Sequence, residues 1–374
     1  MFAYIIRRLL ISIVILFFAT ILVFLLVSSA GDPLALLRRM VEIPSLSGEE
    51  SVLAGFVVEA MQSLGFRASV DSAGNAVGVL GEGPTEILLL GHLDTVPGMI
   101  PVRVEAGKLY GRGSVDAKGP LATFIAAAAR TGPLPGKRIV VVGATEEEAA
   151  SSRGARYATQ VFRPSHCIIG EPSGARAVTI GYKGRIVLAY EARRAASHSA
   201  APGASVLEEG VEFWNRVKRW AEAFNADKVM FDRLDPTLRE IRSEHDGLEE
   251  AIALRASIRI PLGLTPEDVQ RQVKGLTAEP GEVRFWGADP PFRAEKNTPL
   301  VRAFLRAIRE AGLDPAFKVK SGTSDMNVVG AVWRCPILAY GPGDSSLDHT
   351  PQEHLDLAEY ELAIAILARV LALL

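Results

Sequence analysis

The chain has 374 residues, of which 48% are hydrophobic, and its formal net charge at pH 7 is -2. This length allows two domains with sizeable cores, and the balanced charge gives no indication of a nucleic-acid partner. The two cysteines, Cys167 and Cys335, each lie beside an apolar run, so neither a disulfide framework nor a cysteine-ligated zinc site is expected.

The N-terminal segment, residues 1–33, differs from the rest of the chain. Residues 9–27 are apolar except for Ser12 and Thr20, and a run of this length is typical of a transmembrane helix. The segment resembles the beginning of a dipeptide ABC-transporter permease subunit, which would make the protein a membrane transport component. No further apolar run of that length follows, so the segment is interpreted as a membrane anchor, a fusion or the product of a misassigned start.

The remaining sequence alternates between helical and strand-like segments. Residues 33–66 predict two amphipathic helices interrupted at residues 44–48, where Ser47 and Glu50 have the spacing of a capping box. Such alternation favours an α/β fold with a mostly parallel sheet. The predicted strands are short apolar runs at residues 87–90, 138–145, 167–170 and 335–341.

His92 and Asp94 follow the first of these strands. Residues i and i+2 of a strand point the same way, so both side chains face the space beyond the strand's C-terminal end, where open α/β sheets bind ligands. A metal-bound imidazole commonly donates its other ring N–H to a carboxylate, which indicates that Asp94 orients His92. The alternative for this pair alone is an ordinary hydrogen-bonded loop.

Acidic residues stand at the ends of the other strands as well. Any one of these groups alone would be interpreted as a solvated loop, but several at one edge of a sheet would repel one another unless cations lay between them. Three carboxylates and two neutral imidazoles suit two divalent ions, and mixed nitrogen and oxygen ligation suits zinc or cobalt. The predicted ligands are His92, Asp116, Glu147, Glu171 and His349, with Glu146 as the general base acting on water and Glu148 as a supporting hydrogen-bond partner.

Seven motifs carry a resemblance to a known family: GHLDTVP, GRGSVDAKGP, ATEEE, IIGEPS, ASHSAAP, SGTSDMN and DHTPQEH. In this order they resemble the signature series of the dinuclear metal aminoacylase/carboxypeptidase family, of the acetylornithine deacetylase and succinyl-diaminopimelate desuccinylase type. The resemblance implies amide hydrolysis by an enzyme in which each of two metals has three protein ligands. One metal would be bound by His92, Asp116 and Glu171, and the other by Asp116, Glu147 and His349.

The resemblance also implies a zinc-peptidase-like catalytic domain with an inserted small α/β lid and dimerisation domain. The catalytic domain would comprise residues 34–180 and 287–374, and the lid residues 181–286. In a homodimer built through the lid, His198 would reach the active site of the other subunit. Its motif departs from many relatives, because EARRAASHSAAP has no glycine three or four residues before the histidine.

The same resemblance places a substrate carboxylate beside Arg259, whose planar guanidinium suits a carboxylate clamp. Gly322 and Thr323 would lie on a loop that contacts this carboxylate. The alternative for Arg259 is an ordinary exposed strand residue.

Within the family, GYKG and SGTSDMN most resemble the hydrolase that releases lysine or ornithine from an amino-group carrier protein in lysine and arginine biosynthesis. Its substrate holds the amino acid through the α-amino group on the side chain of the carrier's C-terminal glutamate. This implies a cytoplasmic enzyme with a protein substrate. The alternative is an acetylornithine deacetylase, a succinyl-diaminopimelate desuccinylase or a carboxypeptidase acting on a small free substrate.

Overall fold

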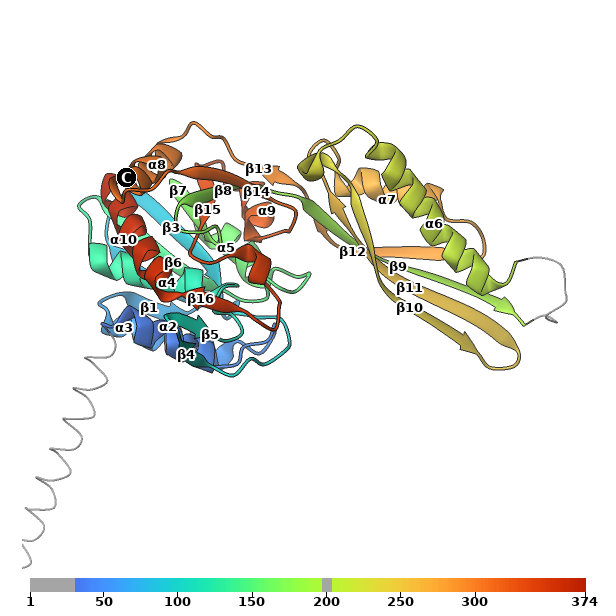
Figure 1. Ribbon diagram of the computed structural model, residues 1–374, viewed down its shortest axis with the longest axis horizontal. Helices are drawn as coiled ribbons and strands as arrows, with labels where there is room; N and C mark the ends of the chain where they lie inside the picture. Colours follow the sequence, from blue (N-terminus) through green and yellow to red (C-terminus); the bar gives the residue numbers. More distant parts are fainter. Residues whose placement is uncertain (1–30, 197–203) are drawn as a thin grey trace, which may run out of the picture.

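The computed structural model describes residues 31–196 and 204–374. The apolar residues 9–27 and His198 therefore lie outside the described residues. Within the two described ranges, no helix is long and apolar enough to cross a membrane. The described elements form two bodies, each with its own hydrophobic core (Figure 1).

A nine-stranded sheet forms the centre of the larger body, in the order β1, β2, β6, β3, β7, β15, β8 and β13, with β14 paired to β8. The pairs of β3 with β6 and β7, of β7 with β15 and of β8 with β14 are parallel. This sheet confirms the predicted α/β class with mostly parallel strands. The strands are β1 (Arg67–Val70), β2 (Ala76–Gly81), β3 (Thr85–His92), β6 (Lys137–Ala144), β7 (His166–Gly170), β8 (Ala177–Tyr182), β13 (Phe292–Arg293), β14 (Ala316–Lys320) and β15 (Ile337–Tyr340).

Helices pack against this sheet and against one another (Figure 1). Helix α4 (Lys118–Thr131) contacts β3, β6 and β7, and α10 (Leu357–Leu373) packs on α4. The other helices of the larger body are α2 (Pro33–Glu42), α3 (Ser51–Ser63), α5 (Arg153–Val161), α8 (Pro299–Glu310) and α9 (Asp325–Gly330), with a short 3-10 helix at Ser345–Leu347. A second 3-10 helix, Met230–Asp232, belongs to the smaller body described below. A small sheet joins β4 (Arg103–Glu105), β5 (Lys108–Tyr110) and β16 (His354–Asp356).

The central strand β3 explains where a site can form. Its residues 87–90 are fully buried, as expected for an apolar run covered on both faces. In the parallel register, His92 at its end pairs with Ala144 of β6, and Leu90 pairs with Ile169 of β7. The segments that follow these three strands therefore meet at the same edge of the sheet.

The predicted helix boundary near residue 50 is correct, but the predicted capping box is wrong. Helix α3 begins at Ser51 without a side-chain cap. Ser47 Oγ instead donates to Asp94 Oδ2 at 2.7 Å, and Glu50 Oε1 accepts the backbone N–H of Glu146 at 2.9 Å. Both side chains hold loops at the edge of the central sheet, because those buried loop groups need hydrogen-bond partners.

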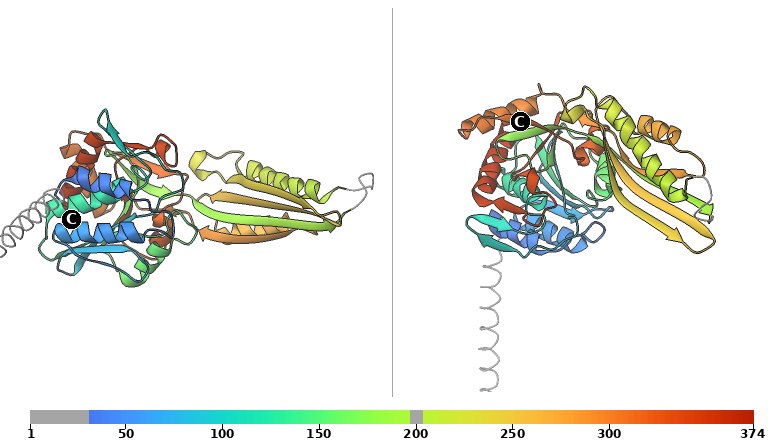
Figure 2. Two further views of the ribbon diagram at one scale, coloured as in Figure 1. Left: turned by 90° about the horizontal axis from the view of Figure 1, so that it is seen from below. Right: turned by 45° about the vertical axis from the view of Figure 1, so that its right-hand side comes forward.

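The smaller body, called the lid below, comprises the described residues 184–196 and 204–289 and projects from the larger one (Figure 2). Its sheet has the order β10, β11, β9, β12 with antiparallel pairs. The apolar side chains of this sheet pack against helices α6 and α7. The sheet and the two helices together enclose the second hydrophobic core. The elements are β9 (Gly184–Ala195), α6 (Val206–Phe224), β10 (Asp235–His245), β11 (Glu249–Ile260), α7 (Pro266–Gly275) and β12 (Glu282–Asp289).

The chain passes between the two bodies after Lys183 and again after Asp289. Asn327 joins the two crossings, because its Nδ2 donates to Lys183 O at 3.0 Å and to Pro290 O at 2.8 Å. Asn327 is fully buried, so these bonds are sheltered from water. One side chain of the larger body therefore holds both connections to the lid.

Candidate metal centre and substrate cavity

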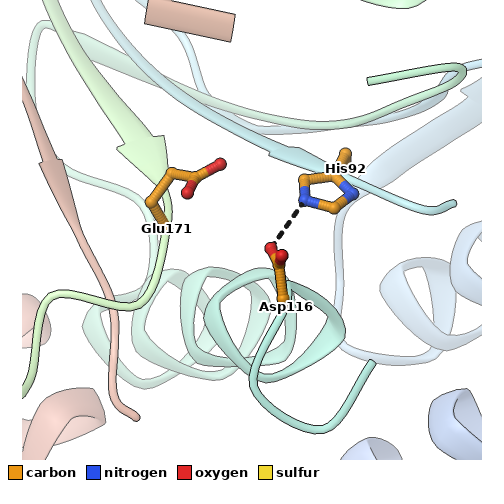
Figure 3. Close-up of side chains that lie close together, drawn as sticks. All are labelled: His92, Asp116 and Glu171. Carbon is orange, nitrogen blue, oxygen red and sulfur yellow. Dashed lines mark ion pairs between the residues drawn. The ribbon is translucent and has the colours of Figure 1, made fainter. Parts of the chain in front are cut away.

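Three predicted ligands from different segments converge at the edge where β3 and β7 end (Figure 3). His92 is the last residue of β3, Asp116 lies just before α4, and Glu171 directly follows β7. One donor atom of each lies within 4.8 Å of the others, and His92 Nε2 is 3.4 Å from Asp116 Oδ1. The structure thus brings together the whole set predicted for the first metal.

Asp116 belongs to a second group as well, which it shares with Glu148 and His349. The Nε2 atom of His349 lies 3.1 Å from Asp116 Oδ2 and 2.9 Å from Glu148 Oε1. Asp116 therefore stands between the two groups with one carboxylate oxygen directed to each. Such a shared carboxylate is the arrangement expected of a bridging ligand.

Asp94 lies beside the imidazole of His92, as predicted from the sequence. His92 Nδ1 is 3.0 Å from the Asp94 backbone oxygen and 3.5 Å from Asp94 Oδ1. These contacts occupy Nδ1 and leave Nε2 directed at Asp116. Nε2 of His92 is buried and has no hydrogen-bond partner among the described residues.

In the run of three glutamates after β6, the residue beside Asp116 and His349 is one position later in the sequence than predicted. Glu148, and not Glu147, joins Asp116 and His349. Glu146 Oε2 instead accepts a hydrogen bond from Ser151 Oγ at 2.5 Å, and Oε1 lies 3.6 Å from Arg153 Nη1. The Glu147 side chain lines the cavity described below.

The local backbone explains this shift. Glu146 has a φ of +58°, so the chain turns in a left-handed conformation directly after the strand. The next two N–H groups then both donate to Asp94, from Glu147 to Oδ1 at 3.0 Å and from Glu148 to Oδ2 at 2.9 Å. A run of like residues carries no signal of this turn, and therefore the sequence alone did not show which glutamate reaches the ligand position.

Glu353 supports Asp116 and was not recognised from the sequence, although it belongs to the quoted motif DHTPQEH. Its Oε1 accepts the backbone N–H groups of Val115 at 3.0 Å and Asp116 at 3.1 Å. Its Oε2 accepts from Arg112 Nη1 at 2.7 Å. The carboxylate is fully buried, so this ion pair fixes the turn that presents Asp116.

The pKa shifts of the ionisable side chains indicate that both residue groups suit bound cations. The carboxylates of Asp116 and Glu148 raise the pKa of His349 to about 10. Burial raises the pKa of Glu171 to about 7 and that of Asp348 to about 9, with the Asp116 carboxylate adding to both shifts. Buried carboxylates with raised pKa values and an unsatisfied imidazole nitrogen together fit divalent cations held by oxygen and nitrogen donors.

A cavity of about 560 Å³ extends from these groups to the lid. Glu147, Glu171 and Asp348 line its acidic side, and residues 320–323 lie on its wall. Lid residues, among them the predicted Arg259, also line the cavity, as do the predicted Gly322 and Thr323 within the 320–323 segment. Arg259 Nη1 donates to Thr323 Oγ1 at 2.9 Å, so the predicted substrate-contacting residues do meet across the two bodies.

Comparison with known proteins gives one family. Residues 88–373 match the model described as peptidase family M20/M25/M40. The chain is 50% identical to the [LysW]-lysine hydrolase of Deinococcus radiodurans over 90% of this chain and 95% of that protein. It is 40% identical to a putative [LysW]-lysine/[LysW]-ornithine hydrolase of Thermococcus kodakarensis over 92% of each chain.

Solved structures show the same fold at low sequence identity. An M20 family metallo-carboxypeptidase from Sulfolobus solfataricus superposes with a TM-score of 0.72 at 18% identity, covering 91% of this chain and 99% of that one. The YxeP protein of Bacillus subtilis, described as a dinuclear metal-binding peptidase of the M20 family, gives a TM-score of 0.67 at 12% identity, covering 92% and 97%.

Proposed function

The chain belongs to peptidase family M20/M25/M40 and is a metal-dependent hydrolase, and from this premise we propose that it releases lysine or ornithine from an amino-group carrier protein. The observation that carries the proposal is the 50% identity to a [LysW]-lysine hydrolase along nearly the whole of both chains. Biosynthesis of lysine and arginine from such a carrier takes place in the cytoplasm, which is the location we propose.

We propose that two divalent ions, zinc or cobalt, bind at the two groups. His92, Asp116 and Glu171 would hold one ion, and Asp116, Glu148 and His349 the other. Divalent ions held by these residues would supply polarisation of the amide carbonyl and a lowered pKa of bound water. Asp94 keeps Nε2 of His92 available by holding Nδ1.

Glu147 is the general base in this proposal, in place of the predicted Glu146. Its carboxylate lines the cavity between the ligands and the lid, whereas Glu146 is engaged with Ser151. Burial raises the pKa of Glu147, and the carboxylates of Glu148 and Glu171 raise it further. Glu147 therefore accepts a proton from the attacking water and passes it to the leaving nitrogen, which departs as the α-amino group of lysine.

The lid supplies substrate recognition in this proposal. Arg259 binds the carboxylate of the lysine or ornithine that is released, and Gly322 and Thr323 close the cavity beside it. The proposed enzyme is a homodimer joined through the lids, in which His198 acts in the site of the other subunit.

Amino-acid release from four substrates tests the function. Full-length enzyme loaded with zinc or cobalt is incubated with carrier-linked lysine, carrier-linked ornithine, acetylornithine and succinyl-diaminopimelate. We expect turnover of the carrier-linked substrates to exceed that of the two small ones by at least about 100-fold in kcat/KM. Preference for either small substrate would replace the proposal with the deacetylase or desuccinylase alternative.

A further inference from the structure

Like charges lie side by side at the end of the lid sheet that faces the metal centre. In the register of the sheet, Arg259 of β11 is directly opposite Arg185 of β9. Asp235 of β10 flanks Arg259, and Asp289 of β12 flanks Arg185. Like charges directly opposite each other destabilise a sheet, so this pair requires compensating anions.

The two flanking aspartates compensate only part of this charge. Asp235 is paired with Lys183, at 2.5 Å between Oδ2 and Nζ. Asp289 is shared, because its two oxygens accept from Arg156 and Arg185 at 3.1 Å each. Arg259 itself has no carboxylate within 4.0 Å among the described residues, and its contact with Thr323 is neutral.

A third guanidinium, that of Arg239 on β10, enters the same cavity. Leu238 pairs with Ala256 and Glu240 with Arg255, so Arg239 is the extra residue of a β-bulge. Bulges next to active sites redirect a side chain that the regular alternation would turn elsewhere. Nε of Arg239 lies 3.4 Å from Ser257 Oγ, on the face of the sheet that also carries Arg259.

Arg239 likewise has no carboxylate within 4.0 Å among the described residues, and the neighbouring Glu240 pairs with Arg242 and Arg255 instead. Burial, together with the charges of Arg185 and Arg239, lowers the pKa of Arg259 to about 10. The lid side of the cavity thus presents two guanidinium groups without an acidic partner. Two carboxylates on one substrate would satisfy both.

We propose that Arg239 binds a second substrate carboxylate, on the acyl side of the scissile amide, while Arg259 binds the carboxylate of the amino acid that is released. This subsite rests on the proposed function, in which the acyl group is the side chain of a C-terminal glutamate. That linkage leaves the glutamate α-carboxylate free, and a guanidinium suits it through paired charged hydrogen bonds. An acetyl group has no such carboxylate, so Arg239 is a specificity-determining residue.

A matched pair of small substrates tests the subsite. Both consist of N-acetylglutamate joined through its γ-carboxyl to the α-amino group of lysine. In one the glutamate α-carboxyl is free, and in the other it is a primary amide of nearly equal size. Lysine release is measured with the metal-loaded, full-length wild type and with Arg239→Gln.

The control is Arg255→Gln. Arg255 carries the same charge on β11, lies outside the cavity and pairs with Glu240 at 3.8 Å. We expect the wild type to favour the free carboxylate by about 10- to 100-fold in kcat/KM, the effect of one hydrogen bond to a charged group. Arg239→Gln should lose this preference, because only the free-carboxylate substrate loses a partner, whereas Arg255→Gln should behave as wild type.

Three results would overturn the subsite. Equal hydrolysis of the two substrates by the wild type would show that no second carboxylate is recognised, while leaving the proposed function intact. An equal loss on both substrates in Arg239→Gln would assign Arg239 a role in the fold or the chemistry. If the wild type hydrolyses neither small substrate and also fails on carrier-linked lysine, both the proposed function and the subsite are wrong.

Discussion

The carboxylate of Asp94 accepts the backbone N–H of Glu147 at 3.0 Å. Because the same aspartate holds the imidazole of His92, one buried side chain sets the position of the glutamate run relative to the first ligand. Glu147 then follows the left-handed residue Glu146 and lines the cavity.

Amide substitutions at the two neighbouring glutamates distinguish their roles. Glu147→Gln should lower kcat on carrier-linked lysine by about 100-fold or more while two metal ions stay bound, since it removes the proton acceptor. Glu146→Gln should retain turnover, because it changes only contacts with Ser151 and Arg153. Steady-state kinetics and elemental analysis on both variants decide between them. The reverse pattern would restore Glu146 as the base.

Glu353→Gln should weaken metal binding although Glu353 is not a ligand. The substitution removes the charge that pairs with Arg112 and holds the turn at Asp116, and loss of such support typically costs about 10- to 100-fold in metal affinity. Competition with a chelator measures the dissociation constants.

The matched control is Glu86→Gln, at the other end of β3. Glu86 is also buried, pairs with Arg138 and accepts the N–H of Arg163 at 3.2 Å. Its substitution should lower stability and leave metal affinity unchanged. Equal loss of metal affinity in both variants would attribute the effect to general destabilisation.

Metal-free protein should lose stability as the pH rises, more steeply than metal-loaded protein. Folding raises the pKa of Glu171 from 4.5 to about 7 and that of Asp348 from 3.8 to about 9. Groups with raised pKa values contribute stability below their unfolded pKa and lose it as the pH passes through the folded one. His349, raised from 6.5 to about 10, acts in the same direction.

Thermal unfolding of chelated and metal-loaded protein between about pH 5 and pH 9 tests this expectation. The difference in Tm between the two forms should grow with pH, and Asp348→Asn should reduce the slope of the chelated form. Parallel slopes for the two forms would contradict the assignment of these carboxyl groups to a cation site.

Asn327→Ala should destabilise the connection between the two bodies. It leaves the buried oxygens of Lys183 and Pro290 without their donor, which costs about 1–3 kcal/mol in the free energy of unfolding. Denaturant unfolding gives this value, and faster amide exchange at the start of β9 would locate it. Asn297→Ala, at an exposed position, serves as the control. Equal effects of the two substitutions would exclude a role at the crossings.

The sequence predicted the parts of the molecule that depend on hydrophobic pattern. Uninterrupted apolar runs such as residues 87–90 indicate buried strands, and the position of His92 follows from the end of that strand. Parallel strands then bring their C-terminal ends together, which accounts for the group of His92, Asp116 and Glu171. These inferences need only periodicity and strand direction.

Features that depend on individual loop dihedrals were not accessible from the sequence. The positive φ of Glu146 selects Glu148 as the residue beside His349, and a run of three glutamates does not encode that choice. The bulge at Arg239 likewise arises from the pairing of β10 with β11, which no local pattern reveals. Ser47 and Glu50 have the spacing of a cap, but tertiary partners take both side chains.

The two crossings between the bodies have a consequence for how such enzymes diversify. Strands β8 and β13 pair with each other, Tyr182 opposite Phe292, so they are the arms of a β-hairpin whose turn has been replaced by the whole lid. All five residues of the two candidate metal groups lie in the larger body, which contains the hairpin. Arg185, Arg239 and Arg259 lie in the lid, which takes the place of the turn. The candidate metal ligands and the three cavity arginines therefore lie on separate parts of the chain, and exchanging the inserted lid between relatives should change the arginines of the cavity while the metal centre keeps its scaffold.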